Sequence, residues 1–250
     1  MDACEPRGYK FQPKRLFGHF YAFVRGNPPD EPTSEWDSDG RLQECVAISR
    51  LVRPTSIGFE YSSRLRYGPG EELRIIPGPV GGFGAQAWIE NTNHNWLAAN
   101  DVTAIIELWR QADLSSLPDR LRRALWYHEY AARTYLAAIR WVLVTIGIEA
   151  LINTGANRAS KQFNIRFCAL ARKFAGKEVS HTKASQAYEL RSRIAHGAGL
   201  NDLIQDHHKL YSLLEEVLRA TIKAGMGSRD VQQIFASDET VEKEWPLPPG

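Results

Sequence analysis

The chain has 250 residues, enough for one large domain or two smaller ones with a sizeable buried core. Apolar residues make up 43% and charged residues 24%, as in an ordinary globular protein, and a net charge of +2 favours no class of partner. The three cysteines are scattered and form no C-x-x-C pair, which argues against a disulfide framework or a zinc ribbon and favours a reducing compartment.

The chain shows no sign of a membrane segment or a secretory signal. Its first residues, MDACEPRGYK, lack the apolar run of a signal peptide. The longest apolar run, WVLVTIGIEALI at residues 141–152, contains Glu149 and is well short of the roughly twenty residues that a membrane span needs. We therefore expect a cytoplasmic protein without membrane association.

Residues 1–114 are predicted to form a small α/β region. A helix is expected from Ser38, where polar side chains can cap it, until Pro54 ends it. Residues 58–68 (GFEYSSRLRYG) alternate apolar and polar side chains, which predicts a half-buried strand, and the following GPGE turn and ELRII run predict its hairpin partner. The glycine-rich stretch 78–85 matches no phosphate-binding motif and is interpreted as a loop. No motif assigns a role to this region.

From about residue 100 the apolar spacing is helical almost to the end of the chain. Helices are predicted over residues 100–112, 118–154, 160–174, 181–195 and 202–224. Long helices with short connections indicate an antiparallel bundle, here over residues 115–226. Residues 227–250 are predicted to be a helical tail with a disordered end. The expected fold class is therefore α+β: a C-terminal antiparallel helical bundle behind a small N-terminal α/β region.

The stretch YELRSRIAHG, residues 188–197, places an arginine on a face that should be buried. Gly197 is a natural helix stop. Helical spacing puts Arg191 on one stripe with Tyr188 and Ile194, whereas Arg193 faces away, four residues after Glu189, in the favourable order for an exposed ion pair. Arg191 therefore requires an explanation that Arg193 does not.

Two features offer such an explanation. His196 abuts Gly197, so unwinding of the last turn would bring its imidazole toward Arg191, and Ser192 lies on the histidine's side of the helix. Glu149 lies in a helix that is apolar nearly all round, and a buried carboxylate and a buried arginine are each costly alone. We expect Glu149 or another buried acceptor to hold Arg191. On these residues alone, a structural ion pair between two bundle helices remains the alternative.

The motif Arg-Ser-Arg-Ile-Ala-His within a helical bundle resembles the signature of the HEPN superfamily, R-x(4–6)-H with Asn, Asp or Ser after the arginine. Together with RALWYHEYAARTYLAAIRWVLVTIGIEALINTG, it is most similar to the Apea-like HEPN branch, over residues 118–225. In this resemblance Arg191 and His196 match the catalytic arginine and histidine, and Ser192 stands at the polar position, where Asn is commoner. The bundle is accordingly expected to be of the HEPN type.

The resemblance implies metal-independent RNA cleavage without a cofactor, in which a 2′-hydroxyl attacks the adjacent phosphorus. Arginine suits the charge that develops on the phosphate, and histidine can move a proton near neutral pH. HEPN nucleases pair two bundles at one cleft, which implies a homodimer. The family further implies the effector of a bacterial phage-defence or toxin–antitoxin system, with an antitoxin or sensor protein as partner. The alternative is a non-catalytic HEPN module that binds nucleotide or RNA, or only dimerises.

The stretch just ahead of the motif is rich in basic residues. Seven basic side chains against Glu178 alone give residues 157–183 a local charge of +6. A basic face beside the cleft would attract a phosphate backbone, although a solvated helix face is the alternative. The candidate RNA-binding residues are Arg158, Lys161, Arg166, Arg172 and Lys173. His207 and His208 lack a third ligand at a recognisable spacing, so no metal site is predicted.

Overall fold

The computed structural model describes residues 38–54, 63–66, 74–77, 97–111, 116–134, 136–155, 157–197 and 207–248. The chain divides into two compact units, Met1–Glu44 with Gly58–Gly84 and Cys45–Ile57 with Ala85–Gly250. In the first unit β1 (Ser63–Arg66) pairs antiparallel with β2 (Arg74–Pro77). The predicted hairpin is thus present over these strands. The rest of the predicted strand and the loop at 78–85 lie outside the described residues.

All the regular secondary structure that is described in the second unit is helical. In chain order the helices are α1 (Ser38–Val52, which begins in the first unit), α2 (Ala99–Gln111), α3 (Asp119–Arg133), α4 (Ala137–Ile152), α5 (Ala159–Leu170), the π-turn η3 (Ala171–Ala175), α6 (His181–Ala195), α7 (His208–Gly227), α8 (Arg229–Ile234) and α9 (Asp238–Glu244). None of the described helices combines the length and apolar character needed to span a bilayer.

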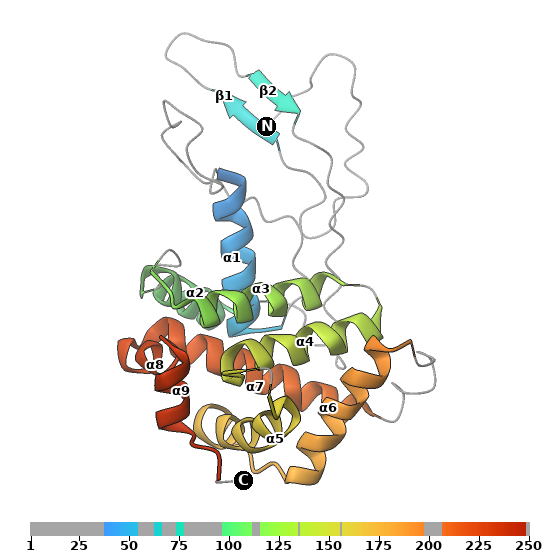
Figure 1. The fold of residues 1–250 in the computed structure, drawn as a ribbon. Helices are drawn as coiled ribbons and strands as arrows, with labels where there is room; N and C mark the ends of the chain where they lie inside the picture. Colours follow the sequence, from blue (N-terminus) through green and yellow to red (C-terminus); the bar gives the residue numbers. More distant parts are fainter. Residues whose placement is uncertain are drawn as a thin grey trace. The chain divides into compact units, whose positions relative to one another are not determined.

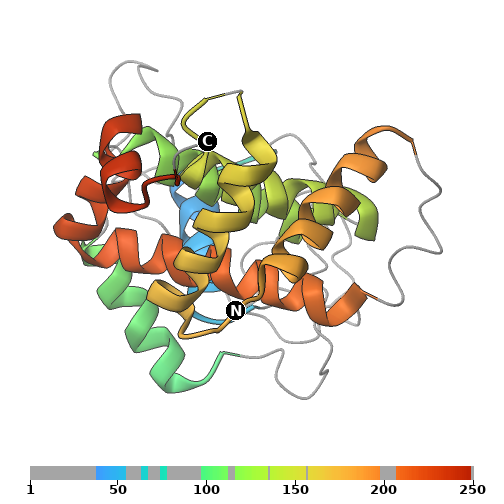
Figure 2. The same ribbon diagram turned by 60° about the horizontal axis from the view of Figure 1, so that its bottom comes forward.

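Helices α3 and α4 pack as a first antiparallel pair, and helices α5 and α6 pack as a second (Figure 1). At one end of the first pair, Arg120 of α3 donates to the Ala150 carbonyl at the end of α4, over 2.9 Å. In the second pair the Phe163 ring of α5 lies 5.4 Å from the Tyr188 ring of α6. Helix α7 packs against α3, α4 and η3, and the α5–η3 segment crosses it in Figure 2. The predicted helical bundle is therefore confirmed.

The long element predicted over residues 118–154 is two helices, and the break falls at Thr134. The Thr134 N–H bonds to the carbonyls of Tyr130 and Ala131, and its hydroxyl donates to Tyr130 over 2.6 Å. The Thr134 backbone itself is extended, with φ of −76° and ψ of 131°, and this ends α3 at Arg133. Arg140 then donates to the Thr134 carbonyl from the first turns of α4. The sequence offered no proline or glycine here to signal the turn.

The boundaries of the bundle also differ from those predicted. The second half of α1 and the whole of α2 belong to the helical unit, although both fall within residues 1–114. The tail after residue 226 belongs to it as well, because Phe235, Val241 and Trp245 are buried in the same core as Trp141. Helices α8 and α9 confirm that the tail is helical.

The approach of α7 to α3 gives a testable prediction at Gly225. A Cβ at this position would lie 2.6 Å from Leu121 Cδ1, and Leu121 is fully buried. We expect Gly225→Ala to lower the free energy of unfolding by about 1–3 kcal/mol, because overpacking outweighs the better helix propensity of alanine. Gly227→Ala is the control in the same helix, since its Cβ would meet only Gln111 Oε1 at 3.4 Å. Equal denaturation midpoints for the two variants would contradict this packing.

Candidate functional site

Arg191 of α6 forms an ion pair with Glu149 of α4. Arg191 Nη2 lies 3.1 Å from Glu149 Oε2, and the two side chains are 28% and 13% exposed. Glu149 is half-buried because α4 carries apolar residues on most of its sides, so the guanidinium supplies the partner that its carboxylate needs. The predicted pairing of these two residues is confirmed. Arg191 is half-buried rather than fully buried.

The surroundings of this pair hold both side chains in place. Asn153 Nδ2 donates to the other carboxylate oxygen of Glu149 over 3.4 Å. The Arg191 guanidinium carbon lies 6.0 Å from the centre of the Tyr188 ring, within the range of a cation–π contact. Arg191 Nε is buried and makes no hydrogen bond with the described residues. The Glu149 contact therefore leaves part of the guanidinium without a partner among these residues.

The proposed histidine lies at the end of the same helix. The backbone of His196 closes α6, its N–H donates to the Ser192 carbonyl over 3.0 Å, and Gly197 follows with φ of 81°. The helix end predicted at Gly197 is confirmed. The His196 side chain is exposed and Ser192 is half-buried. Neither side chain makes a hydrogen bond with Arg191 among the described residues, so the structure brings Arg191 to Glu149 but does not join it to His196.

Arg193 faces solvent on the opposite side of α6. The ion pair that we predicted between Arg193 and Glu189 is absent from the described residues. The Glu189 carboxylate instead accepts a hydrogen bond from Ser185 Oγ over 2.9 Å. Arg193 therefore serves as an exposed reference for variants at Arg191.

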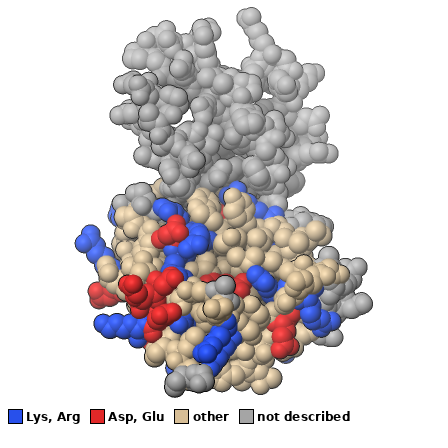
Figure 3. All heavy atoms as spheres, in the orientation of Figure 1, with Lys and Arg blue, Asp and Glu red and all other residues tan. Residues whose placement is uncertain are grey.

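Three of the seven basic side chains at residues 157–183 form ion pairs with carboxylates of the described residues, one of them within the stretch and two on other helices. Arg172 binds Glu178 through two hydrogen bonds of 2.9 and 3.0 Å, Lys173 pairs with Glu244 of α9, and Lys177 pairs with Glu216 of α7. On the face drawn in Figure 3, basic and acidic side chains of the described residues are interspersed, with no broad field of one sign. Arg158 is exposed. The Lys161 Nζ donates to the Pro248 carbonyl over 3.5 Å.

Arg166 is a structural residue, and its predicted role in RNA binding is wrong. Its side chain is 1% exposed. The guanidinium donates to the carbonyls of Trp245, over 3.0 Å, and Ile152, over 2.6 Å, and to Gln162 Oε1, over 2.9 Å. A fully buried guanidinium with these acceptors joins α5 to the end of α4 and to the tail, and it presents nothing to a nucleic acid.

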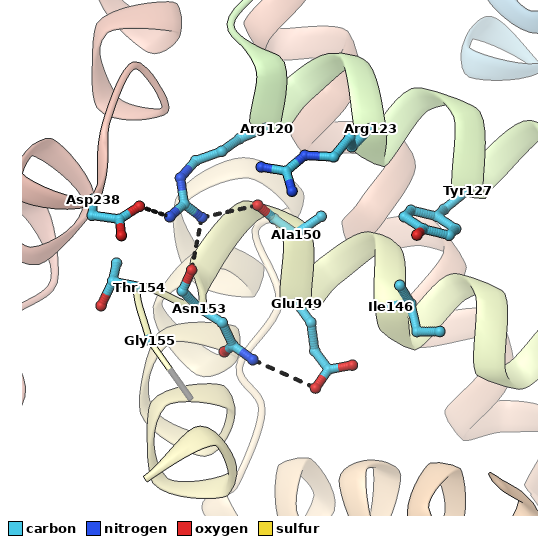
Figure 4. A pocket seen from close by; sticks show the side chains of 10 residues that line it. All are labelled: Arg120, Arg123, Tyr127, Ile146, Glu149, Ala150, Asn153, Thr154, Gly155 and Asp238. Atoms are coloured by element: carbon cyan, nitrogen blue, oxygen red, sulfur yellow. Dashed lines mark hydrogen bonds and ion pairs between the residues drawn. The ribbon is translucent and has the colours of Figure 1, made fainter. Parts of the chain in front are cut away.

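A groove of about 510 Å³ lies between α3 and α4, next to the Arg191–Glu149 pair (Figure 4). It is lined by Arg120, Arg123, Tyr127, Ile146, Glu149, Ala150, Asn153, Thr154, Gly155 and Asp238. The α3 and α4 residues recur at helical spacing and form the two walls. Sequence reasoning missed this groove. The spacing Arg120, Arg123, Tyr127 was a visible signal for one wall, but nothing in the sequence pointed to Asp238 as its neighbour.

None of the described residues forms a group of three or more histidine, cysteine, aspartate or glutamate side chains that could hold a metal ion. The His207 ring Nε2 lies 2.9 Å from Gln186 Nε2, so this histidine contacts an amide of α6. Asp206, which precedes it, lies outside the described residues. The structure therefore offers no donor set from which to build a metal centre in the part of the chain that it describes.

Glu149 gives a prediction that NMR can test. Burial raises the pKa of Glu149, and although the charge and hydrogen bond of Arg191 and the hydrogen bond of Asn153 lower it, the net pKa lies above the ordinary value of 4.5. A carboxyl with a raised folded pKa binds its proton more tightly in the folded chain. Its contribution to stability is therefore greatest at low pH and declines as the pH rises from 4.5 through the folded pKa.

We expect Arg191→Ala to raise the pKa of Glu149 further, because the positive charge of Arg191 is the largest influence that lowers this pKa. Asn153→Ala should raise it by less. A carbon-13 NMR titration of the Glu149 carboxyl in the unaltered chain, in Arg191→Ala and in Asn153→Ala measures the three pKa values and hence their order. An unchanged pKa in Arg191→Ala would contradict the pairing, and a pKa below 4.5 in the unaltered chain would show that burial is not the dominant influence.

No protein-family model, curated protein or solved structure matches this chain. The residues of the site are therefore the basis for its function.

Proposed function

We propose that this chain is a metal-independent endoribonuclease of the HEPN type, with Arg191, Ser192 and His196 at its active site. One observation carries the proposal: an arginine fixed by a half-buried carboxylate lies five residues before an exposed histidine, at the end of the same bundle helix. Such a pair supplies a fixed cation and an imidazole that can accept or donate a proton.

The two side chains divide the work. Arg191 binds the scissile phosphate with the nitrogens that Glu149 leaves available, and stabilises the charge that develops as the 2′-hydroxyl attacks. Its half-buried position strengthens this interaction relative to a fully solvated arginine. His196 moves a proton from the 2′-hydroxyl or to the leaving 5′-oxygen. The products are a 2′,3′-cyclic phosphate end and a 5′-hydroxyl end, and Ser192 contributes a polar contact beside them.

One histidine provides either the acid or the base of this reaction, and the other is supplied by a second copy of the chain across a composite cleft. The exposed position of His196 is compatible with this arrangement. Light scattering over a concentration series is expected to give twice the chain mass of 28.2 kDa. A strictly monomeric protein that still cleaves RNA would contradict the composite cleft.

A non-catalytic HEPN module is the second candidate, and the Arg191–Glu149 pair favours it in one respect. An ion pair that joins α4 to α6 contributes to the fold whether or not Arg191 contacts a substrate. The two candidates differ at His196, whose exposed side chain has no such structural contact among the described residues.

Incubation of the purified chain with RNA in EDTA, beside the His196→Ala variant, tests the proposal. Cleavage by the unaltered chain alone, with cyclic phosphate ends and with DNA left intact, is the expected result. Equal cleavage by both proteins, or by neither under any activating condition, would overturn it. We place the enzyme in the cytoplasm, as effector of a bacterial phage-defence or toxin–antitoxin system with an antitoxin or sensor protein as partner.

A further inference from the structure

The groove between α3 and α4 carries chemistry that the proposed ribonuclease reaction does not use. We propose that it binds a small organic anion with a flat ring, such as an aromatic carboxylate or an aromatic phosphate ester. Its volume of about 510 Å³ lies within the range of small-molecule sites in proteins. The inference concerns the groove alone and does not depend on the ribonuclease proposal.

Of the two arginines that line the groove, Arg123 is the one exposed to a ligand. Arg120 pairs with Asp238, and Glu149 pairs with Arg191, so these charges are balanced within the protein. Arg123 is 55% exposed, and its Nε lies 3.0 Å from Asp119 Oδ2. Its two terminal amino groups make no hydrogen bond with the described residues. Two parallel N–H donors on one guanidinium match the oxygens of a carboxylate or a phosphate, so the groove favours an anion.

The apolar part of the groove lies beside this cation. In Figure 4 the Tyr127 ring and the Ile146 side chain face each other across α3 and α4, one turn further along from Arg123. A flat ring packed between them would bury apolar surface and contact the face or edge of Tyr127. A ligand with an anionic group at one end and a ring at the other thus fits the order of these side chains.

The groove is held open by contacts that exist without a ligand. The buried guanidinium of Arg120 donates to the carbonyls of Ala150 and Asn153, each over 2.9 Å, and pairs with Asp238 of α9. These contacts fix the end of α4 and the adjacent wall. A preformed groove loses little conformational freedom on binding, which favours affinity for a small ligand.

Titration calorimetry with phenyl phosphate and with benzoate tests the proposal on the full chain. Phenol and inorganic phosphate are the comparison ligands, because each carries only half of the required chemistry. We expect at least one of the two aromatic anions to bind, with both comparison ligands weaker by about tenfold or more. The tighter of the two anions identifies whether a carboxylate or a phosphate is preferred.

Two neighbouring arginines provide matched variants. Arg123→Gln is expected to weaken binding by about tenfold or more, because it removes the charged donors. Arg122→Gln should leave the affinity unchanged, since Arg122 pairs with the same Asp119 but does not line the groove. Both side chains are exposed, so both variants should melt like the unaltered protein.

Three results would overturn the proposal. The first is the absence of binding by both aromatic anions at millimolar concentration. The second is an equal loss in Arg122→Gln and Arg123→Gln, which would indicate general surface charge. The third is binding of inorganic phosphate as tightly as phenyl phosphate, which would remove the role of Tyr127 and Ile146.

Discussion

The Arg191→Ala variant is expected to lose both RNA cleavage and stability, whereas His196→Ala is expected to lose cleavage alone. Removing Arg191 leaves the half-buried Glu149 carboxylate with only the weak Asn153 contact. A fully buried ion pair would lose about 3–5 kcal/mol on removal of one partner. We expect about 1–2 kcal/mol here, because both side chains retain access to water and the raised pKa of Glu149 eases its protonation. His196 makes no side-chain contact of this kind.

Thermal melting and cleavage of a labelled RNA, measured on the same preparations, separate the two variants. Arg193→Ala is the control on α6, since its side chain is exposed and has no ion pair among the described residues; it should change neither measurement. The double variant Arg191→Ala with Glu149→Gln should recover much of the lost stability without recovering cleavage. An essential Arg193 beside a dispensable Arg191 would show that the opposite face of α6 carries the function.

The features of the site that were predicted correctly depend on short-range spacing and on the cost of burying a charge without an opposite charge beside it. Helix α6 spans the predicted residues 181–195, and its end follows from Gly197, which stops it. The Arg191–Glu149 pair follows because a charge on a buried stripe requires an opposite charge, and α4 offered a single carboxylate on an apolar helix. Neither inference required knowledge of how distant helices pack.

The errors arise where distant parts of the chain meet. Arg166 was assigned to RNA binding from its local surroundings, but its burial depends on the Trp245 carbonyl, 79 residues away. Lys173 and Lys177 were counted as uncompensated charges, although Glu244 and Glu216 neutralise them. The charge count over residues 157–183 included no partners from other helices. It therefore overstated the basic character of this surface.

The groove escaped prediction for a related reason. Its two walls come from α3 and α4, which the sequence presented as one continuous helix, so that Arg123 and Glu149 were not expected to face each other. The turn at Thr134 brings these walls together, and Asp238 reaches them from the tail. Thr145 and Thr221 make the same bond to the preceding turn inside α4 and α7, which continue without a break, so a threonine at position 134 gave no sequence signal for the turn.

A buried ion pair between α1 and α3 supplies the prediction with the largest expected effect on stability. Arg50 and Glu129 contact each other directly, and each side chain is 1% exposed. Glu129 Oε1 also accepts from Arg133 over 2.7 Å, from one turn further along α3. Charges at this depth are stable only in each other's presence, because water cannot solvate whichever one is left behind.

We expect Glu129→Gln to lower the free energy of unfolding by about 3–5 kcal/mol, because it removes the negative charge that balances the buried Arg50 while keeping the shape of the side chain. Urea denaturation followed by far-ultraviolet circular dichroism measures the loss. Glu178→Gln is the matched control, since Glu178 forms a two-bond ion pair with Arg172 at the surface, where water screens both charges, and little change is expected. If the two variants unfold at similar urea concentrations, the α1–α3 pair is solvated in solution, and α1 is not held against the bundle in the way that the burial of Arg50 implies.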